Sequence, residues 1–227
     1  MTTIKQYLLS SIGKKVVMAS TGLFLCVFLL EHIYGNILLY AGDDGSAFNE
    51  YSHSASHNII IRIIEFVLFG SIIAHVFQAI VITKDNAKAR PIKYAVSTST
   101  EGSSWFSRNM GITGSIIFFF IVIHLYNFFL PYRITEMPNG ATLAVITKAA
   151  FQNPIYVCIY CVGVTFLFFH LLHGFRSSFH TLGLNNKKYT PLWKAIGTGF
   201  ALLMWIGFIS FPILFYFNLA GNNIPNL

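Results

Sequence analysis

The chain consists of long apolar runs separated by shorter polar stretches. Five of these runs reach about 20 residues, the length an α-helix needs to cross the hydrocarbon core of a bilayer. We therefore expect an all-α integral membrane protein with one membrane domain over residues 1–227. Its predicted transmembrane helices are 16–40, 59–82, 110–130, 154–175 and 192–219. The polar stretches 42–58, 97–109 and 131–153 are expected to be the least helical parts.

Composition supports the membrane assignment. Hydrophobic residues make up 55% of the chain and charged residues only 10%, outside the usual range of soluble proteins. The first apolar run is longer than the roughly 7 to 15 residues of a signal peptide and lacks a small-residue cleavage site, so we expect it to be retained. The spacing Cys158-x-x-Cys161 resembles a redox motif, but inside an apolar helix it is better explained by packing.

Basic residues predict the orientation of the chain in the membrane. Twelve of the fifteen lie in the N-terminal segment and in the second and fourth connections: Lys5, Lys14, Lys15, Lys84, Lys88, Arg90, Lys93, Arg108, Arg176, Lys187, Lys188 and Lys194. Cytoplasmic segments are enriched in Lys and Arg, so we expect the N-terminus in the cytoplasm and the C-terminus outside. The net charge of +7 comes without a nucleic-acid-binding motif, and the basic faces are expected to meet anionic lipid or a cytoplasmic partner.

Four histidines lie inside the first four predicted helices, at two depths. With a rise of 1.5 Å per residue, His32 and His124 lie roughly 21 to 24 Å from the cytoplasmic starts of their helices. His75 and His170 lie roughly 24 Å from the outer starts of theirs. The four residues therefore form an outer and an inner pair, and two stacked haems with two histidine ligands each would use them all.

Small residues beside the histidines would make room for such a group. Gly35, Ala79 and Gly174 follow His32, His75 and His170 by three or four residues, whereas no glycine lies near His124. A single membrane histidine is more often a hydrogen-bonded helix contact than a metal ligand. A proton-coupled transporter would also use buried histidines, but it usually shows inverted repeats and broken helices, and this chain has no internal repeat.

Four short motifs in order carry a resemblance to a known family. STGLFL…EH runs from Ser20 to His32, IAHVFQAI from Ile73 to Ile80, MGITG…HLY from Met110 to Tyr126, and HLLHGF from His170 to Phe175. Together they are similar to the di-haem cytochrome b membrane subunit of succinate:quinone oxidoreductases, the succinate dehydrogenases and fumarate reductases with a five-helix anchor. The fifth predicted helix matches only in being a membrane span.

The resemblance implies two haem b groups, with His32 and His124 on the outer iron and His75 and His170 on the inner iron. His173 lies one turn from His170 and could also reach the iron, but in the family the ligand precedes a glycine by four positions, which favours His170. Arg176 could pair with a haem propionate or extend to the membrane surface. His53, His57 and His180 are expected to be solvated.

Carboxylates are candidates for proton exchange with a quinone, because quinone reduction takes up protons. Glu31 and Glu65 lie inside predicted helices near the outer face, and Glu50 lies in the outer loop before the second helix. The resemblance points to a glutamate in that loop, so Glu50 and Glu65 are the candidates for the quinone, expected to be menaquinone. Glu65 could instead form a buried pair, and Glu50 could be plain surface.

The family also implies partners. The chain has no flavin motif, phosphate-binding glycine loop or iron–sulfur cysteine cluster, so a flavoprotein subunit and an iron–sulfur subunit would be separate chains on the cytoplasmic side. The expected function is to carry electrons between that iron–sulfur subunit and membrane quinone, in a bacterial cytoplasmic membrane. Another quinone-linked di-haem cytochrome b and a histidine-using proton-coupled transporter remain the alternatives.

Overall fold

The computed structural model describes residues 4–88, 109–135, 137, 140–184 and 186–227. It is 84% helical, and among the described residues it has no strand and five helices long and apolar enough to cross a membrane. The all-α class and the number of membrane helices are therefore confirmed. The long helices are α2 (Ser11–Ile37), α4 (Ile59–Lys88), α6 (Met110–His124), α9 (Pro154–Thr181) and α10 (Thr190–Tyr216).

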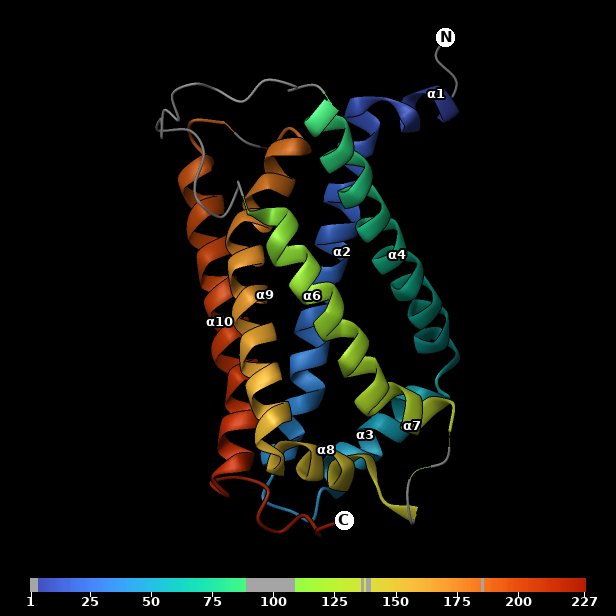
Figure 1. Cartoon of the computed structure of the whole chain (residues 1–227), viewed down its shortest axis with the longest axis vertical. Coiled ribbons are helices and arrows are strands. Elements are labelled where there is room, and N and C mark those ends of the chain that lie inside the picture. The colour runs from blue at the N-terminus through green and yellow to red at the C-terminus, as the bar shows by residue number, and fades with distance from the viewer. Residues whose placement is uncertain (1–3, 89–108, 136, 138–139, 185) are drawn as a thin grey trace.

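Short segments extend two of these helices. The 3-10 turn η1 (Leu38–Tyr40) continues α2, and the π-helical turn η2 (Leu125–Phe129) joins α6 to α7 (Leu130–Arg133). Before α2, the six-residue helix α1 (Ile4–Leu9) points away from the bundle (Figure 1). Helix α2 begins at Ser11 because the Ser10 hydroxyl accepts a hydrogen bond from the Gly13 N–H at 3.0 Å, an N-cap that starts the helix before the apolar run.

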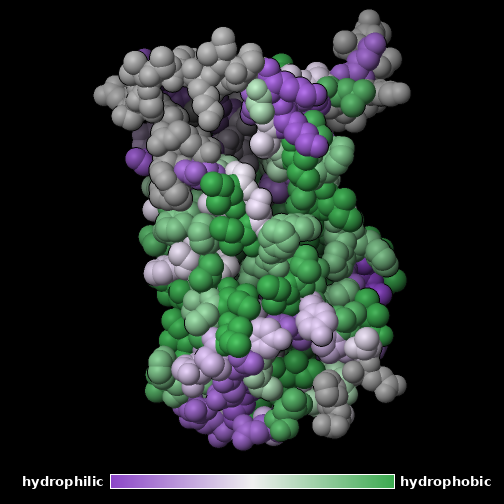
Figure 2. All heavy atoms as spheres, in the orientation of Figure 1, coloured by the Kyte–Doolittle hydropathy of each residue, from purple (hydrophilic) through white to green (hydrophobic). Residues whose placement is uncertain are grey.

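The surface of the bundle identifies a multi-pass membrane protein. Figure 2 shows hydrophobic side chains over the middle of the visible face and hydrophilic ones toward its two ends. Large apolar residues are exposed along the whole of α4, which has no buried residue. Exposed apolar surface on this scale is stable only in contact with lipid.

The two chain ends lie at opposite ends of the bundle (Figure 1). We call the end with the N-terminus the basic end, because it carries the starts of α2 and α10 and the ends of α4 and α9, with their lysines and Arg176. There Lys14 of α2 and Asp85 of α4 form an ion pair of 2.7 Å. Of the twelve basic residues assigned to this end by sequence, Arg90, Lys93 and Arg108 lie outside the described residues.

We call the opposite end the closed end, because two short helices cover it. These are α3 (Ser46–His57) and α8 (Leu143–Gln152). They lie in 42–58 and 131–153, two of the stretches predicted to be the least helical, and each of these stretches still contains a short helix. The third such stretch, 97–109, lies outside the described residues except for its last residue. Both helices bury a single face, including Phe48 and Phe151, and so lack a long apolar run. The Asn49 side-chain oxygen of α3 accepts the N–H of Ala144 in α8 at 3.1 Å, which holds the two helices together.

Local caps set where these two helices begin. The carboxylate of Asp43 accepts the backbone N–H groups of Ala47 and Gly45, which hold the pKa of this carboxyl below its usual range. The Thr142 hydroxyl accepts the N–H of Val145 and caps α8. Both caps are short-range polar contacts of the kind that begins a helix in an otherwise polar stretch.

The three basic residues of the closed end all have partners within the chain. Arg62 and Arg133 contact the Glu65 carboxylate at 2.9 and 3.4 Å, and Lys148, only 6% exposed, donates to the Ile224 carbonyl at 2.6 Å. Their charges are therefore used in packing the closed end, whereas the lysines of the basic end are mostly exposed.

Candidate functional site

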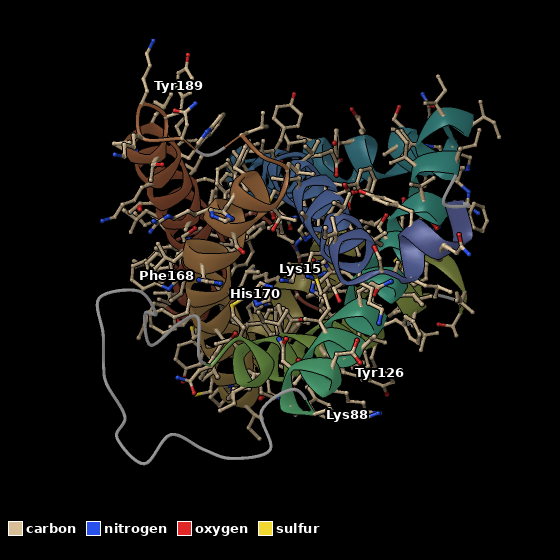
Figure 3. The ribbon with its side chains drawn as sticks, turned by 90° about the horizontal axis from the view of Figure 1, so that it is seen from above. Lys15, Lys88, Tyr126, Phe168, His170 and Tyr189 are labelled. Carbon is tan, nitrogen blue, oxygen red and sulfur yellow. The ribbon has the colours of Figure 1, made fainter. Side chains whose placement is uncertain are left out.

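The four histidines singled out in the sequence meet in two pairs inside the bundle. His32 of α2 faces His124 of α6, with ring centroids 5.6 Å apart and ring planes at 88°. His75 of α4 faces His170 of α9, with ring centroids 6.2 Å apart and ring planes at 66°. We call these the α2–α6 pair and the α4–α9 pair. Seen along the bundle, His170 lies toward the interior, whereas Tyr126 lies at the periphery (Figure 3).

Aromatic rings surround the α2–α6 pair. His32 stacks on Phe28, one turn earlier in α2, at 5.3 Å and 20°, and contacts Phe208 of α10 at 5.6 Å. His124 contacts Phe128 at 5.3 Å and Tyr160 at 6.0 Å. The rings limit how far either imidazole can rotate, because each neighbour is stiff and closely packed.

The backbone changes its winding directly after His124. Helix α6 ends at this residue, and the next five residues, Leu125–Phe129, form the π-helical turn η2. A π-turn inserts an extra residue into the helix and shifts the faces on either side of it relative to one another. The turn keeps Phe128 against His124 while α7 continues to the contact between Arg133 and Glu65.

Glycines lie beside the α4–α9 pair. A Cβ atom at Gly22 of α2 would lie 3.2 Å from Cε1 of His75, and one at Gly114 of α6 would lie 3.9 Å from Cε1 of His170. Gly174, one turn after His170 in α9, is also next to that ring. The missing side chains let the helix backbones lie directly against the two imidazole rings.

A hydrogen bond fixes the orientation of His75. The hydroxyl of Thr21 in α2 lies 3.1 Å from Nδ1 of His75 and 2.8 Å from the Val17 carbonyl. A hydroxyl has one proton, and the carbonyl can only accept, so Thr21 donates to Val17 and accepts from the Nδ1–H of His75. Nε2 of His75 then carries the lone pair, which is the state of a neutral imidazole that binds a metal.

The imidazole that faces His32 and the one that faces His75 each have a nitrogen without a hydrogen bond. Nδ1 of His124 and Nδ1 of His170 are buried and have no hydrogen-bond partner, and the only other such side-chain atom among the described residues is Oε1 of Gln78. Two imidazoles that bind one metal ion from opposite sides, with metal–nitrogen bonds of about 2 Å, have ring centroids about 6 Å apart. Both pairs are near this separation.

The donor atoms present fit a haem. Within the described ranges, no group of three or more His, Cys, Asp or Glu side chains could hold a metal. A haem iron needs only two protein ligands, because the macrocycle supplies the other four. A pair of opposed imidazoles is therefore a sufficient protein donor set for a haem.

His173 and Arg176 lie farther along α9 toward the basic end. His173 is half-buried, and Arg176 is exposed. The ring that faces His75 is that of His170. His53 and His57 stack on each other on the exposed surface of α3, with ring centroids 4.0 Å apart, far along the chain from either pair.

The three candidate carboxylates lie in different surroundings. Glu65 is held by Arg62 and Arg133. Glu50 is exposed and lines a hollow of about 320 Å³ at the closed end, between α3, α8 and the C-terminal residues. Glu31 accepts a hydrogen bond of 2.6 Å from the Tyr51 hydroxyl. The structure therefore does not gather the carboxylates into one cluster.

Some residues of the site were missed in the sequence. Thr21, Gly22 and Gly114 all contact or approach an imidazole from a neighbouring helix, whereas Gly35, expected beside His32, packs against Tyr51. Spacing within one helix indicates only the small residues on the histidine's own helix. The depth of each residue, which follows from the constant rise, also indicates small residues at the same level on neighbouring helices.

A bundle of five membrane-spanning helices with two interior pairs of opposed imidazoles places the chain in the class of multi-pass membrane proteins. Comparison of the sequence with protein families identifies one family. The model of the succinate dehydrogenase/fumarate reductase transmembrane subunit matches residues 86–209, more than half of the chain, and the chain belongs to this family. No curated protein and no solved structure matches it significantly.

The matched segment covers one histidine of each pair. It begins near the end of α4, includes α6 and α9 with His124 and His170, and ends within α10. His32 and His75 lie outside it. The structure therefore adds what the family match does not contain, namely the imidazole that faces each matched histidine.

Proposed function

We propose that the chain is the membrane-anchor cytochrome b subunit of a succinate dehydrogenase or fumarate reductase, carrying electrons between an iron–sulfur subunit and membrane quinone through two haem b groups. The observation that carries this proposal is the pair of opposed imidazoles at each of two positions in a member of this family. Each haem, when bound, supplies one-electron transfer. Family membership favours this function over another quinone-linked cytochrome or a transporter.

Each residue of the site has a distinct proposed role. His32 and His124 ligate one iron, and His75 and His170 ligate the other. Thr21 holds the Nδ1–H of His75 and so directs Nε2 to the metal. Arg176, near the basic end, neutralises a haem propionate at the membrane surface. The aromatic rings around the α2–α6 pair exclude water from it.

Carboxylates at the closed end would serve the quinone. Reduction of a quinone to a quinol takes up two electrons and two protons, so a site at this end needs a path for protons from water. We propose Glu50 and Glu65 for proton exchange, because Glu50 lines an open hollow and Glu65 lies near the start of α4, at the same end of the bundle. Glu50→Gln or Glu65→Gln should lower quinone-linked activity while both haems stay bound.

The proposed orientation places the basic end in the cytoplasm of a bacterial cell, where the flavoprotein and iron–sulfur subunits would dock. The exposed lysines at the starts of α2 and α10 and the end of α4 support this, since cytoplasmic segments are rich in Lys and Arg. The α4–α9 pair would then be nearer the partner subunits, and the α2–α6 pair nearer the outer face.

The test is the haem content of the purified protein. We expect a b-type spectrum after reduction with dithionite and two haems per chain. Co-purification with a flavin-containing subunit would separate this function from that of another di-haem cytochrome. A ratio of one or zero haems in well-folded material would contradict the proposal.

A further inference from the structure

Glu31 is a carboxylate on the exposed surface of a membrane-spanning helix. It lies in α2, six residues before the helix ends at Ile37, and its side chain is exposed. A charged side chain inside the bilayer is costly, and such residues usually face a partner or a functional site. Its only partner among the described residues is Tyr51, whose hydroxyl donates to Oε1 at 2.6 Å.

The second carboxylate oxygen is free. Oε2 of Glu31 has no hydrogen-bond partner within the described part of the chain, and neither an arginine nor a lysine contacts the group. Glu65 differs in this respect, because two arginines hold it. Glu31 therefore has an acceptor available for a group that arrives from outside the protein.

The surroundings of Glu31 face the membrane. Val27, Leu30 and Tyr34 share its side of α2 at helical spacing and are 64%, 46% and 65% exposed. Helix α4 does not cover them, because it leaves α2 toward the closed end (Figure 1). A molecule dissolved in the lipid can therefore reach Glu31 from the side, along an apolar strip.

Two tyrosines flank the carboxylate. The rings of Tyr34 and Tyr51 meet at 5.8 Å and 74°, and Gly35 lets the Tyr51 ring lie directly against α2. Burial and the hydrogen bond to the Glu31 carboxylate raise the pKa of the Tyr51 phenol above its usual range. Glu31 also directly precedes His32, one imidazole of the α2–α6 pair.

We propose that Glu31, Tyr34 and Tyr51 form the binding site for the head group of the membrane quinone, in its quinol form above all. The carboxylate accepts the hydroxyl of a quinol, the tyrosine rings flank the flat head group, and the apolar tail lies along Val27 and Leu30. This inference rests on the proposed function, and it names a site that neither Glu50 nor Glu65 forms. Those residues keep their proposed role in proton exchange with the outer water.

A different role for Glu31 would be to anchor α3 to α2 through Tyr51. The variant Glu31→Gln separates the two roles, because the amide oxygen still accepts the Tyr51 hydroxyl while the negative charge is lost. The amide N–H₂ can donate to a quinone carbonyl but cannot accept a quinol hydroxyl. The substitution should therefore weaken binding of quinol more than binding of quinone, whereas a lost anchor would weaken both equally.

The experiment uses the whole complex, with a short-chain naphthoquinone and its quinol as substrates. For Glu31→Gln we expect the KM for quinol in fumarate reduction to rise about tenfold or more, because this is the typical effect of losing a hydrogen bond to a charged group. The KM for quinone in succinate oxidation should rise less. Tyr51→Phe should raise both KM values. Tyr126→Phe, which alters another tyrosine that is 66% exposed, should leave both unchanged.

A second measurement does not depend on any variant. An azido-naphthoquinone photolabel on the wild-type complex should attach to α2 near Glu31 or to α3 near Tyr51. Labelling confined to other segments, or KM values within twofold of wild type in both variants, would overturn this site. The proposed function would still stand if the wild-type complex bound two haems and had quinone activity. A wild-type complex without quinone activity would overturn both.

Discussion

The α2–α6 pair lies among aromatic rings, whereas the α4–α9 pair lies among glycines and a hydroxyl group. Phe28, Phe208, Phe128 and Tyr160 pack around the first pair. Gly22, Gly114 and Gly174 lie at the second, and Thr21 holds His75. The same donor set is thus oriented by packing in one place and by a directed hydrogen bond in the other. Packing tolerates small changes of angle, whereas a hydrogen bond also fixes the tautomer.

The pairs also differ in how firmly their helices are held. Helices α2, α6 and α9 all have buried residues, whereas α4 has none. Helix α4 packs mainly along α2 and much less against α6, and the contacts that join it to α2 include the hydrogen bond from His75 to Thr21 and the ion pair between Asp85 and Lys14. We expect a haem at the α4–α9 pair to contribute more to the placement of its helix than one at the α2–α6 pair.

The largest expected effect comes from removing one imidazole. His170→Ala should reduce the haem content from two per chain to one and remove the haem of the α4–α9 pair, because only one of the two histidines that would hold its iron is left. His124→Ala should remove the other haem. Reduced-minus-oxidised spectra and pyridine haemochrome assays measure this.

His173→Ala is the matched control, since His173 lies one turn from His170 on the same helix. It should keep both haems. Loss of a haem in His173→Ala together with two haems in His170→Ala would show that the ligand of this pair has been misassigned.

The next effect concerns the space beside the α4–α9 pair. In Gly22→Leu the new side chain would meet the His75 ring, since even a Cβ atom there lies 3.2 Å from Cε1. Overpacking of this kind costs about 1 to 3 kcal/mol, which corresponds to about a 5- to 150-fold loss of haem affinity if the cost falls on the haem-bound state. The haem of the α4–α9 pair should be lost preferentially on gel filtration at low protein concentration.

Gly70→Leu is the control for this prediction, because Gly70 also lies in a membrane helix but has nothing within 4 Å of its Cβ position. It should retain both haems. Equal haem loss in both variants would mean that the glycine at Gly22 matters only for general stability.

A smaller effect is expected from Thr21→Val, which keeps the shape of the side chain and removes the acceptor for His75. The hydrogen bond makes the imidazole more basic and favours the oxidised iron, so its removal should raise the midpoint potential of this haem. A contribution of about 1 kcal/mol corresponds to about 40 mV for a one-electron couple. Potentiometric titration should show the shift in one haem only. Thr21→Ser, which keeps the hydroxyl group, should have the wild-type potential.

Much of the architecture could be predicted from the sequence, because long apolar runs have few alternatives in a membrane. The five membrane helices follow from length and hydropathy alone. Helices α3 and α8 could not be predicted in this way, because each buries one face against its neighbours and has no apolar run of spanning length. Their starts depend on single polar caps at Asp43 and Thr142.

For the candidate site, depth along a helix predicted which histidines could meet, because rise per residue is nearly constant. It could not predict what lies between the helices. Arg62 reaches Glu65 within one helix, at i,i+3 spacing, but whether Arg133 also holds Glu65 depends on how α7 follows the π-turn after His124. Tyr51 reaches Glu31 only because α3 folds back against α2. Such contacts depend on tertiary packing, which periodicity does not encode.

The smallest effect is expected from Phe28→Leu at the α2–α6 pair. Phe28 stacks on His32 at 5.3 Å, and an aromatic pair of this kind contributes about 0.5 to 1.5 kcal/mol beyond the area it buries. Because Phe208 and His124 also contact the His32 ring, the imidazole should keep its place. Both haems should stay bound, with a midpoint potential that changes less than in Thr21→Val and a thermal midpoint a few degrees lower. Phe119→Leu, at a position 66% exposed, is the control and should change neither quantity. A potential shift in Phe28→Leu larger than that in Thr21→Val would contradict the comparison, because it would show that a ring stack tunes its imidazole more strongly than a directed hydrogen bond does.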